Sequence, residues 1–287
     1  MTASPDTNAE MSAYWDGERG EAWVARADQF DRQLEIYGLR AVSSAAPEPG
    51  ETVIDIGCGA GATSFEASQA VGSTGKVLGI DISRPMLAVA NQRAQAEAYT
   101  HVEFVHGDAQ TMEPPTDLAN VVVSRFGVMF FDDPVAAFTN IAAMTVAGGR
   151  LAFVCWGPME ANEWMWVPGL AVSGILPMPP AGDPGAPGPF AFHDPERVES
   201  ILTTAGWEDV TFEDVNEPTY LGGPGSVEDT VDFVITSSSM ATALLERSED
   251  DVAEVRRILT ETFTPQHDGV GVRYPALARV VHAVKAE

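Results

Sequence analysis

Asp55 and three glycines that follow it are the residues of this chain whose types and spacing first suggest chemistry. Residues 52–56 are apolar or β-branched at every position except Asp55, a pattern typical of a central strand covered on both faces. Gly57, Gly59 and Gly61 then let the backbone turn sharply and let a ligand approach backbone N–H groups. A helical pattern resumes after the turn and supplies a helix N-terminus beneath it. This combination predicts a nucleotide-type cofactor site.

Two more acids follow the next two predicted strands. Residues 76–80 form an apolar strand that is followed by Asp81, and residues 102–105 form another that leads to Asp108. A carboxylate at the end of the second strand of a βαβ unit can accept both hydrogen bonds of a ribose diol. Because ligands of open α/β sheets bind at the carboxyl ends of the strands, we expect these acids to share one site.

In this arrangement residues 50–156 resemble the class I S-adenosylmethionine (SAM) dependent methyltransferases, especially the small-molecule group that includes the ubiquinone and menaquinone methyltransferases. The resemblance implies an α/β, Rossmann-like fold with a mostly parallel sheet of seven strands, an N-terminal helical cap and a lid inserted after strand five. It also implies SAM as the cofactor, with its ribose on Asp81 and its adenine near Asp108. The other cofactor contacts that it implies are Tyr14, Asp55, Gly57, Cys58, Gly59, Ile82, Met86, Ala109, Ser124 and Phe126.

A nicotinamide or flavin dinucleotide is the alternative ligand for this turn, because Gly57, Gly59 and Ala62 also satisfy the looser G-x-G-x-x-G/A spacing. Asp55 argues against it, since this acid would lie close to a pyrophosphate and repel it but would attract the ammonium group of a methionine. An acid at Asp108 also belongs to the methyltransferase pattern. SAM is therefore the predicted cofactor.

Composition narrows the class of protein and its partners. With 287 residues, 45% of them hydrophobic, the chain is long enough for one α/β domain with elaborations. A net charge of -26 with only two lysines repels a phosphate backbone, so no nucleic-acid partner is expected. No apolar run reaches the length of a membrane span and the first residues lack a signal-peptide pattern, which predicts a cytoplasmic protein. The sequence leaves the oligomeric state open.

The two cysteines are expected to be reduced. With the strand order of the family that the chain resembles, Cys58 and Cys155 end strands two places apart, about 10 Å, which is too far for a disulfide. The position of Cys58 inside the glycine turn favours a packing or backbone role over that of a nucleophile.

Composition along the chain divides it into four segments. Residues 1–10 are expected to be disordered, and residues 13–44 show helical periodicity that is broken around residues 17–20. Residues 157–195 are crowded with Pro and Gly, so we expect a lid that is poor in secondary structure. The predicted division is an N-terminal helical cap at 1–45, a SAM-binding core at 46–156, the lid at 157–195, and a C-terminal completion of the sheet with inserted helices at 196–287.

Local signals predict the remaining elements. Ser83 is placed to cap a helix with a proline in its first turn, and Asp133 is placed to cap another before Pro134. Because a helix cap explains Asp133 fully, we predict no metal site there. Further strands are expected at 118–124, 150–156, 208–215 and 279–284, helices at 63–71, 86–98, 195–205, 227–245 and 249–263, and an aromatic loop at 125–131.

Few side chains need to take part in the chemistry itself. Methyl transfer from a sulfonium is a direct displacement, so alignment and the exclusion of water supply most of the rate, and a base helps an acceptor that must lose a proton. His193 is the first candidate for the base because it is the histidine of the lid, although a structural role at a helix start would also explain it. Arg125 and Tyr14 are the other polar groups expected to face the substrate.

The acceptor half of the site is predicted to be apolar. The aromatic and sulfur side chains expected at the carboxyl edge of the sheet favour a small apolar molecule that offers an O, C or N nucleophile, such as a phenolic, polyketide, terpenoid or quinone-like compound. A protein that uses SAM for other chemistry, or only senses it, is the alternative. The predicted wall residues are Phe126, Met129, Phe130, Trp156, Trp164, Trp166 and Phe190.

Overall fold

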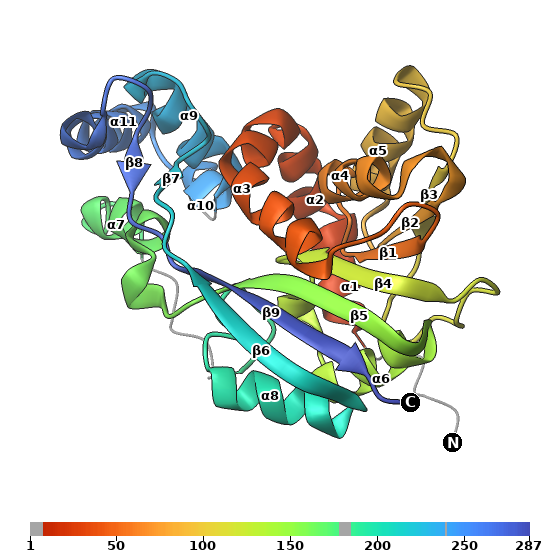
Figure 1. The fold of residues 1–287 in the computed structure, drawn as a ribbon. Coiled ribbons are helices and arrows are strands. Elements are labelled where there is room, and N and C mark those ends of the chain that lie inside the picture. The colour runs from red at the N-terminus through yellow and green to blue at the C-terminus, as the bar shows by residue number, and fades with distance from the viewer. Residues whose placement is uncertain (1–7, 178–184, 239) are drawn as a thin grey trace.

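A seven-stranded sheet forms the centre of the protein, in a computed structural model that describes residues 8–177, 185–238 and 240–287 (Figure 1). Its strand order is β3-β2-β1-β4-β5-β9-β6, and only β9 runs antiparallel to its neighbours. This confirms the mostly parallel Rossmann-like sheet. The strands are β1 (Thr52–Ile56), β2 (Lys76–Asp81), β3 (Val102–His106), β4 (Ala119–Arg125), β5 (Thr145–Trp156), β6 (Trp207–Val215) and β9 (Ala278–Lys285), and a separate pair is β7 (Thr219–Tyr220) with β8 (Arg273–Tyr274).

Helices cover both faces of the sheet. Figure 1 shows α3, α4 and α5 on one face and α6 and α8 on the other. The helices are α1 (Ala9–Asp16), α2 (Glu18–Val24), α3 (Ala27–Ala45), α4 (Ala62–Val71), α5 (Arg84–Ala96), α6 (Pro134–Ala143), α7 (Glu163–Ala171), α8 (Pro195–Thr204), α9 (Val227–Ser237), α10 (Met240–Leu244) and α11 (Glu249–Phe263).

Helix starts lie where short-range signals predicted them. The side chain of Ser83 accepts a hydrogen bond from the Met86 N–H at the start of α5, and Asp133 accepts one from the Ala136 N–H at the start of α6. Both helices have a proline in their first turn, where no backbone donor is needed. The predicted caps are therefore confirmed.

The N-terminal segment is helical almost from the point where the description begins. α1 starts at Ala9, so the expected disorder is wrong for residues 9–10, while residues 1–7 lie outside the described residues. The predicted break occurs at Gly17, between α1 and α2. A second break, between α2 and α3 at residues 25–26, has no sequence signal.

Several boundaries differ from the prediction. Arg125 belongs to β4 and residues 128–130 form a 3-10 turn, so 125–131 is only partly a loop. β5 begins at Thr145 and not at 150, because the irregular pairing opposite Ala119 lets the strand run through two glycines. The helix expected at 227–245 is two helices, α9 and α10.

The lid prediction is wrong in one respect, since residues 157–195 contain the nine-residue helix α7. Helix α7 forms in spite of Pro168 because its apolar residues pack on both sides, and tertiary contacts outweigh intrinsic propensity. Residues 178–184 of the lid lie outside the described residues.

A second hydrophobic core lies beside the sheet. Buried residues of α9, α10, α11 and β8 form it together with Phe30 of α3 and with residues that follow α7 and β7. Trp23 of α2 and Trp164 of α7 pack against both this core and the main one. The first helices and the C-terminal helices therefore meet over the same edge of the sheet. Within the described ranges, no helix combines the length and apolar character that crossing a membrane requires.

Candidate cofactor and acceptor site

The glycine turn joins β1 to α4 and touches the loop that follows β4. Gly57, Gly59 and Gly61 have φ values of +67°, +55° and +89°, a region that favours glycine. A Cβ on Gly57 would lie 2.8 Å from the Cα of Gly127. The chain passes from β1 through α4 to β2 on one side of β1, whereas β4 lies on the other side of β1. The turn therefore lies at the point where the strand order reverses. That is the position at which open α/β sheets bind ligands.

Asp81 connects the glycine turn to the start of α5. Its Oδ2 accepts the Gly59 N–H at 2.7 Å and its Oδ1 accepts the Ser83 N–H at 2.8 Å. The side chain is buried, and burial raises the pKa of its carboxyl group, although the N–H donors of Ser83 and Gly59 oppose the rise. Each carboxylate oxygen can accept further hydrogen bonds, so the predicted contact with a ribose diol is compatible with this geometry.

Asp55 lies beneath the turn and is completely buried. Its Oδ2 accepts the Ser64 hydroxyl at 2.6 Å, whereas its Oδ1 has no hydrogen-bond partner among the residues that the structure describes. Burial raises the pKa of Asp55 to about 7, against the lowering effects of the Ser64 hydroxyl and the Arg125 charge. A buried carboxylate oxygen without a donor is costly, so the site fits a ligand that brings one.

Asp108 lies beyond β3 in a tight turn of its own. Its Oδ1 accepts the Gln110 N–H at 2.9 Å and its Oδ2 lies 3.4 Å from the Thr111 hydroxyl. The N–H of Gly107 donates to the Asp81 carbonyl at 3.0 Å, which ties this turn to the end of β2. The adenine contact predicted for Asp108 stays a prediction.

The other predicted cofactor residues gather around the same strand ends. The Ser124 hydroxyl donates to the Ile56 carbonyl at 2.7 Å, and the Ile82 carbonyl lies 3.1 Å from a His106 ring nitrogen. Phe126 has a positive φ of 61°, and its ring stacks on Trp156 with centroids 4.0 Å apart. Three more of these residues, Cys58, Met86 and Ala109, are buried.

Both cysteines are free and buried. Burial raises the pKa of the Cys58 thiol well above its ordinary value, and it raises that of Cys155 to about 12. A thiol that stays protonated is a poor nucleophile, which favours the packing role for Cys58.

The N-terminal helices lie directly over this region. A Cβ on Gly20 of α2 would lie 2.7 Å from the Ser83 hydroxyl, so α2 rests on the start of α5. Trp15 packs edge-on against Trp23 and Phe130, at 5.7 and 5.1 Å between ring centroids. Tyr14 is 47% exposed and touches the Trp15 ring, so its predicted ligand contact stays a prediction.

The two other predicted catalytic residues lie in different places. The Arg125 guanidinium pairs with Asp31 of α3 at 3.2 Å. His193 lies near the ends of β5 and β9, where its carbonyl accepts a hydrogen bond from Arg279 at 3.1 Å. Its Nδ1 is 2.7 Å from the Phe190 carbonyl, an acceptor, so Nδ1 is the donor and Nε2 is left to accept a proton. The sheet places β5 two strands from β1.

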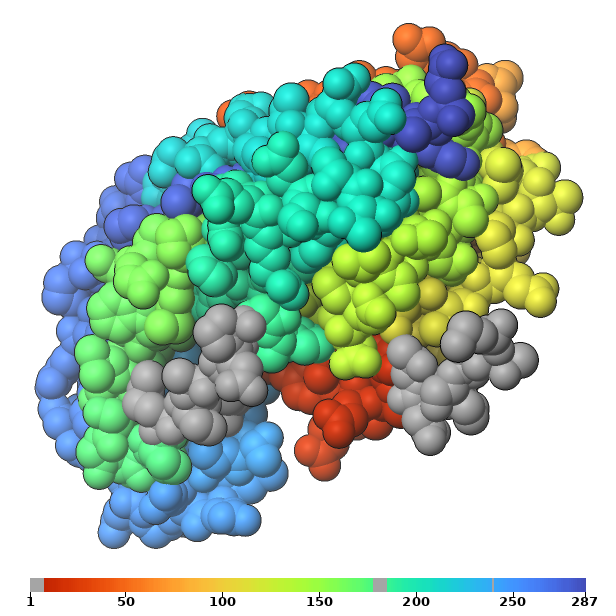
Figure 2. Space-filling model, turned by 90° about the horizontal axis from the view of Figure 1, so that it is seen from below, coloured from red at the N-terminus to blue at the C-terminus, as the bar shows by residue number. Residues whose placement is uncertain are grey.

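The predicted acceptor wall is partly core. Phe126, Met129 and Trp156 are buried in the main cluster, whereas Phe130, Trp164 and Phe190 are only partly buried against it. Figure 2 shows the surface hollowed between the first helices, in red, and the segment of α10, in light blue.

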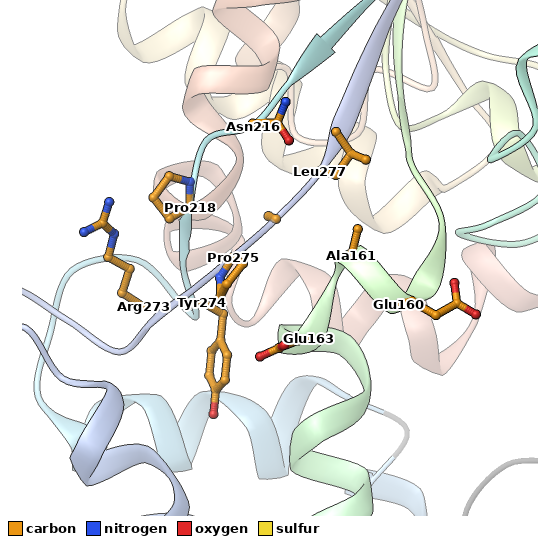
Figure 3. A pocket seen from close by; sticks show the side chains of 10 residues that line it. Glu160, Ala161, Glu163, Asn216, Pro218, Arg273, Tyr274, Pro275 and Leu277 are labelled. Carbon is orange, nitrogen blue, oxygen red and sulfur yellow. The ribbon is translucent and has the colours of Figure 1, made fainter.

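A cleft of about 600 Å³ lies where the chain crosses from the sheet to the second core (Figure 3). Figure 3 shows Arg273 and Glu160 on its two sides and the Tyr274 ring beside Glu163. None of the predicted cofactor residues lines it, and its charged rim does not match an apolar acceptor. Its lining residues are Glu160, Ala161, Glu163, Asn216, Pro218, Arg273, Tyr274, Pro275, Ala276 and Leu277.

Sequence reasoning missed three parts of the site. Ser64, which holds Asp55, carried the weak signal of a hydroxyl in the first turn after the glycines. Gly127 carried a second signal, a lone glycine among aromatic residues after β4. Asp31 carried none, because its partners are far away in the chain.

Comparison with known proteins agrees with this geometry. A sequence-family model described as a methyltransferase domain matches residues 47–164, which include the glycine turn and all three acids. Residues 47–164 form a class I methyltransferase domain. Its cofactor is SAM, and the Asp55 oxygen that has no partner in the described part of the chain fits the ammonium group at the methionine end of that molecule.

Three relatives each match part of this chain. Aklanonic acid methyltransferase DauC of Streptomyces sp. (strain C5) is 38% identical over 46% of this chain and 62% of its own length. A demethylmenaquinone methyltransferase of Oceanobacillus iheyensis is 33% identical over 37% of this chain and 45% of its own. Nocamycin O-methyltransferase of Saccharothrix syringae is 29% identical over 63% of this chain and 71% of its own. The chain thus spans about half to two thirds of the first two.

Solved structures share the fold of the methyltransferase domain. Phosphoethanolamine N-methyltransferase 2 of Haemonchus contortus, in complex with SAM, has a TM-score of 0.58 at 17% identity, over 96% of this chain and 59% of that chain. The [4+2]-cyclase SpnF has a TM-score of 0.56 at 18% identity, over 89% and 81%. At such identities the likeness concerns the fold, and the fold alone does not select the reaction.

Proposed function

We propose that this protein transfers the methyl group of SAM to an O, C or N nucleophile of an apolar small molecule. The observation that carries the proposal is the buried Asp55, whose Oδ1 lies directly beneath a glycine turn and has no donor among residues 8–177, 185–238 and 240–287. The ammonium group of a methionine moiety would supply that donor and a compensating charge. A pyrophosphate at the same place would meet a carboxylate with no cation in between.

The remaining contacts follow from the positions of the other acids. Asp81 would accept from the ribose hydroxyls, while it keeps the Gly59 and Ser83 N–H groups in place. Asp108 and the backbone of Ala109 would lie along the adenine edge, beside β3. Buried Met86 and Phe126 would provide the apolar contacts.

The reaction would need alignment more than side-chain chemistry. Bound SAM would supply a methyl group on a sulfonium. The acceptor's nucleophile would form a bond to that methyl carbon as the carbon–sulfur bond breaks. The protein would hold the acceptor in line with that bond and keep water away. His193 would take the acceptor's proton through Nε2, and Arg125 and Tyr14 would face the reacting groups.

The acceptor would bind where the two hydrophobic cores meet. Trp23 and Trp164 contact both cores, and Trp15 packs on Phe130 at the same edge of the sheet. We propose that the cap (1–45) and the lid (157–195) close over an apolar molecule here. The names of the relatives point to polyketide-type and quinone-type acceptors, and nocamycin O-methyltransferase favours an oxygen nucleophile.

The test is a product assay with SAM labelled in its methyl group. The purified protein is incubated with hydroxyanthraquinones, naphthoquinols and terpenoid alcohols, and both S-adenosylhomocysteine and methylated product are measured. The proposal expects the two in equal amounts with at least one acceptor class. A Gly59→Val variant is the matched control, because it should remove the cofactor turn while it leaves the acceptor region alone.

Other outcomes separate the alternatives. SAM binding without S-adenosylhomocysteine, while the acceptor is rearranged, would indicate a reaction other than methyl transfer. SAM binding with every acceptor unchanged would indicate a sensor. Absence of SAM binding would contradict the proposal as a whole.

A further inference from the structure

Asp31 of α3 lies between two arginines of the methyltransferase domain. Its Oδ2 is 2.7 Å from Nη1 of Arg93 on α5, and its Oδ1 is 3.2 Å from Nη2 of Arg125 at the end of β4. The three side chains are partly buried, with exposed fractions of 21% for Asp31, 25% for Arg93 and 12% for Arg125. One carboxylate of the N-terminal helices thus pairs with two charges of the domain beneath them.

Arg93 continues this bridge into the glycine turn. The same Nη1 that meets Asp31 also donates to the carbonyl of Ala60 at 3.1 Å, and Ala60 stands between Gly59 and Gly61. The side chain of Arg93 therefore links Asp31 to the backbone of the cofactor turn. Helix α3 also approaches closely at Gly38, where a Cβ would lie 3.4 Å from Cδ of Arg125.

The helices that precede α3 also make contacts of their own with α5. α2 rests on the start of α5 through Gly20 and Ser83, and the Asp16–Arg84 ion pair joins α1 to the same helix. The arginine of that pair is 66% exposed, so this contact is screened by water and adds little. Of these two ionic attachments, the more buried bridge at Asp31, with two charge-assisted contacts, is the stronger.

We propose that Asp31 is a positioning residue that holds α1, α2 and α3 closed over the cofactor turn and thereby slows the release of SAM. This proposal rests on the proposed function, because it takes SAM as the ligand of the glycine turn. Asp31 acts through Arg93 and Arg125 and makes no contact with the reacting atoms.

Three variants test the proposal. Asp31→Asn keeps the size of the side chain and removes its charge, and Asp31→Glu restores the charge. Asp28→Asn is the matched control, because Asp28 pairs with the same Arg93 at 2.8 Å from the same helix but its side chain is 82% exposed. Two quantities are measured on folded protein: amide hydrogen exchange of residues 9–24 without cofactor, and the dissociation rate of SAM by stopped flow.

In Asp31→Asn, we expect the amide hydrogens of residues 9–24 to exchange about tenfold faster and SAM to dissociate about tenfold faster. A tenfold change in either rate corresponds to a free-energy change of about 1.4 kcal/mol. The KM for SAM should rise by a larger factor than kcat falls, because Asp31 itself does not touch the reacting atoms. Asp28→Asn should stay within about twofold of the parent protein, and Asp31→Glu should recover most of the loss, as expected for a partly buried charge pair.

Each contrary result has its own meaning. Unchanged exchange in Asp31→Asn would overturn the attachment itself. Faster exchange with an unchanged SAM dissociation rate would overturn the role in cofactor retention, and an equal effect of Asp28→Asn would show that Asp31 has no special place. If the parent protein bound no SAM, the proposed function would fail, while the exchange experiment would still decide whether Asp31 holds the helices.

Discussion

The carboxylate of Asp81 accepts the backbone N–H of Gly59 at 2.7 Å, so the acid that ends β2 holds the turn that follows β1. The register of the two strands explains this contact, since Ile56 pairs with Ile80 and the next residues of each strand stand side by side. The second oxygen of Asp81 holds the start of α5 through Ser83. The shape of the turn therefore depends on Asp81, and the proposed contact with the ribose would depend on the same side chain.

Asp81→Ala should weaken SAM binding by about 1 to 3 kcal/mol, the range for hydrogen bonds to a charged group. Asp81→Asn should lose less, because its carbonyl oxygen can still accept the Gly59 N–H. Titration calorimetry of the three proteins measures the dissociation constants. An affinity unchanged in Asp81→Ala would remove Asp81 from the cofactor site.

Gly59→Val should abolish SAM binding and leave the circular dichroism of the fold largely intact. Gly59 has a φ of +55°, where a β-branched residue is strained, and its N–H must reach Asp81. Gly72→Val is the control, because its φ of +65° imposes similar strain at a helix end with no atom within 4 Å of the new Cβ. Equal SAM binding by folded Gly59→Val and the parent protein would show that this turn is not the cofactor loop.

Asp55 should make stability depend on pH. Burial raises the pKa of Asp55 from its ordinary value of 3.8 to about 7, so the folded state keeps the proton over a range in which the unfolded chain loses it. The stabilising contribution is therefore complete below about pH 4 and is lost as the pH rises through about 7. Urea unfolding over this range should show a decline that Asp55→Asn lacks. Parallel curves for the two proteins would mean that Asp55 titrates normally.

SAM affinity should change with pH in the opposite direction. An ammonium group binds the ionised form of Asp55 better, so affinity should increase several-fold between about pH 6 and pH 7.5, while the amine of the ligand stays largely protonated. Calorimetry in buffers of different ionisation enthalpy should also detect a released proton. An affinity that is flat over this range would place the ammonium group elsewhere.

If His193 is the base, His193→Ala should lower turnover by about a hundredfold or more without changing SAM affinity, and the loss should shrink at high pH as the acceptor ionises by itself. The structure supplies a control, because the side chain that caps α8 is that of Asp194. Asp194→Ala should cost about 1 kcal/mol of stability and leave the rate of the folded protein intact. A normal rate in His193→Ala over a pH series would remove it from catalysis.

Local patterns made much of the sheet and half of the site predictable. The alternation of apolar strands with helices, the caps at Ser83 and Asp133, and the glycine turn all depend on residues a few positions apart. The convergence of Asp55 and Asp81 was predictable for a related reason, since the carboxyl ends of neighbouring parallel strands meet at one edge.

The features with no local signal were decided by packing. The pairing of Asp31 with Arg93 and Arg125 spans 62 and 94 residues, and the contact of Gly57 with Gly127 exists only because β1 lies beside β4. Helix α7 forms where composition suggested an irregular lid, because its apolar side chains pack, partly buried, against two hydrophobic cores. The sequence by itself determined the strand, the glycine turn and the helix of the candidate cofactor site, because adjacent residues form these three elements. Only the tertiary structure decided what covers that site. The contacts of the covering helices join segments that are far apart in the sequence, and these segments meet only when the chain folds.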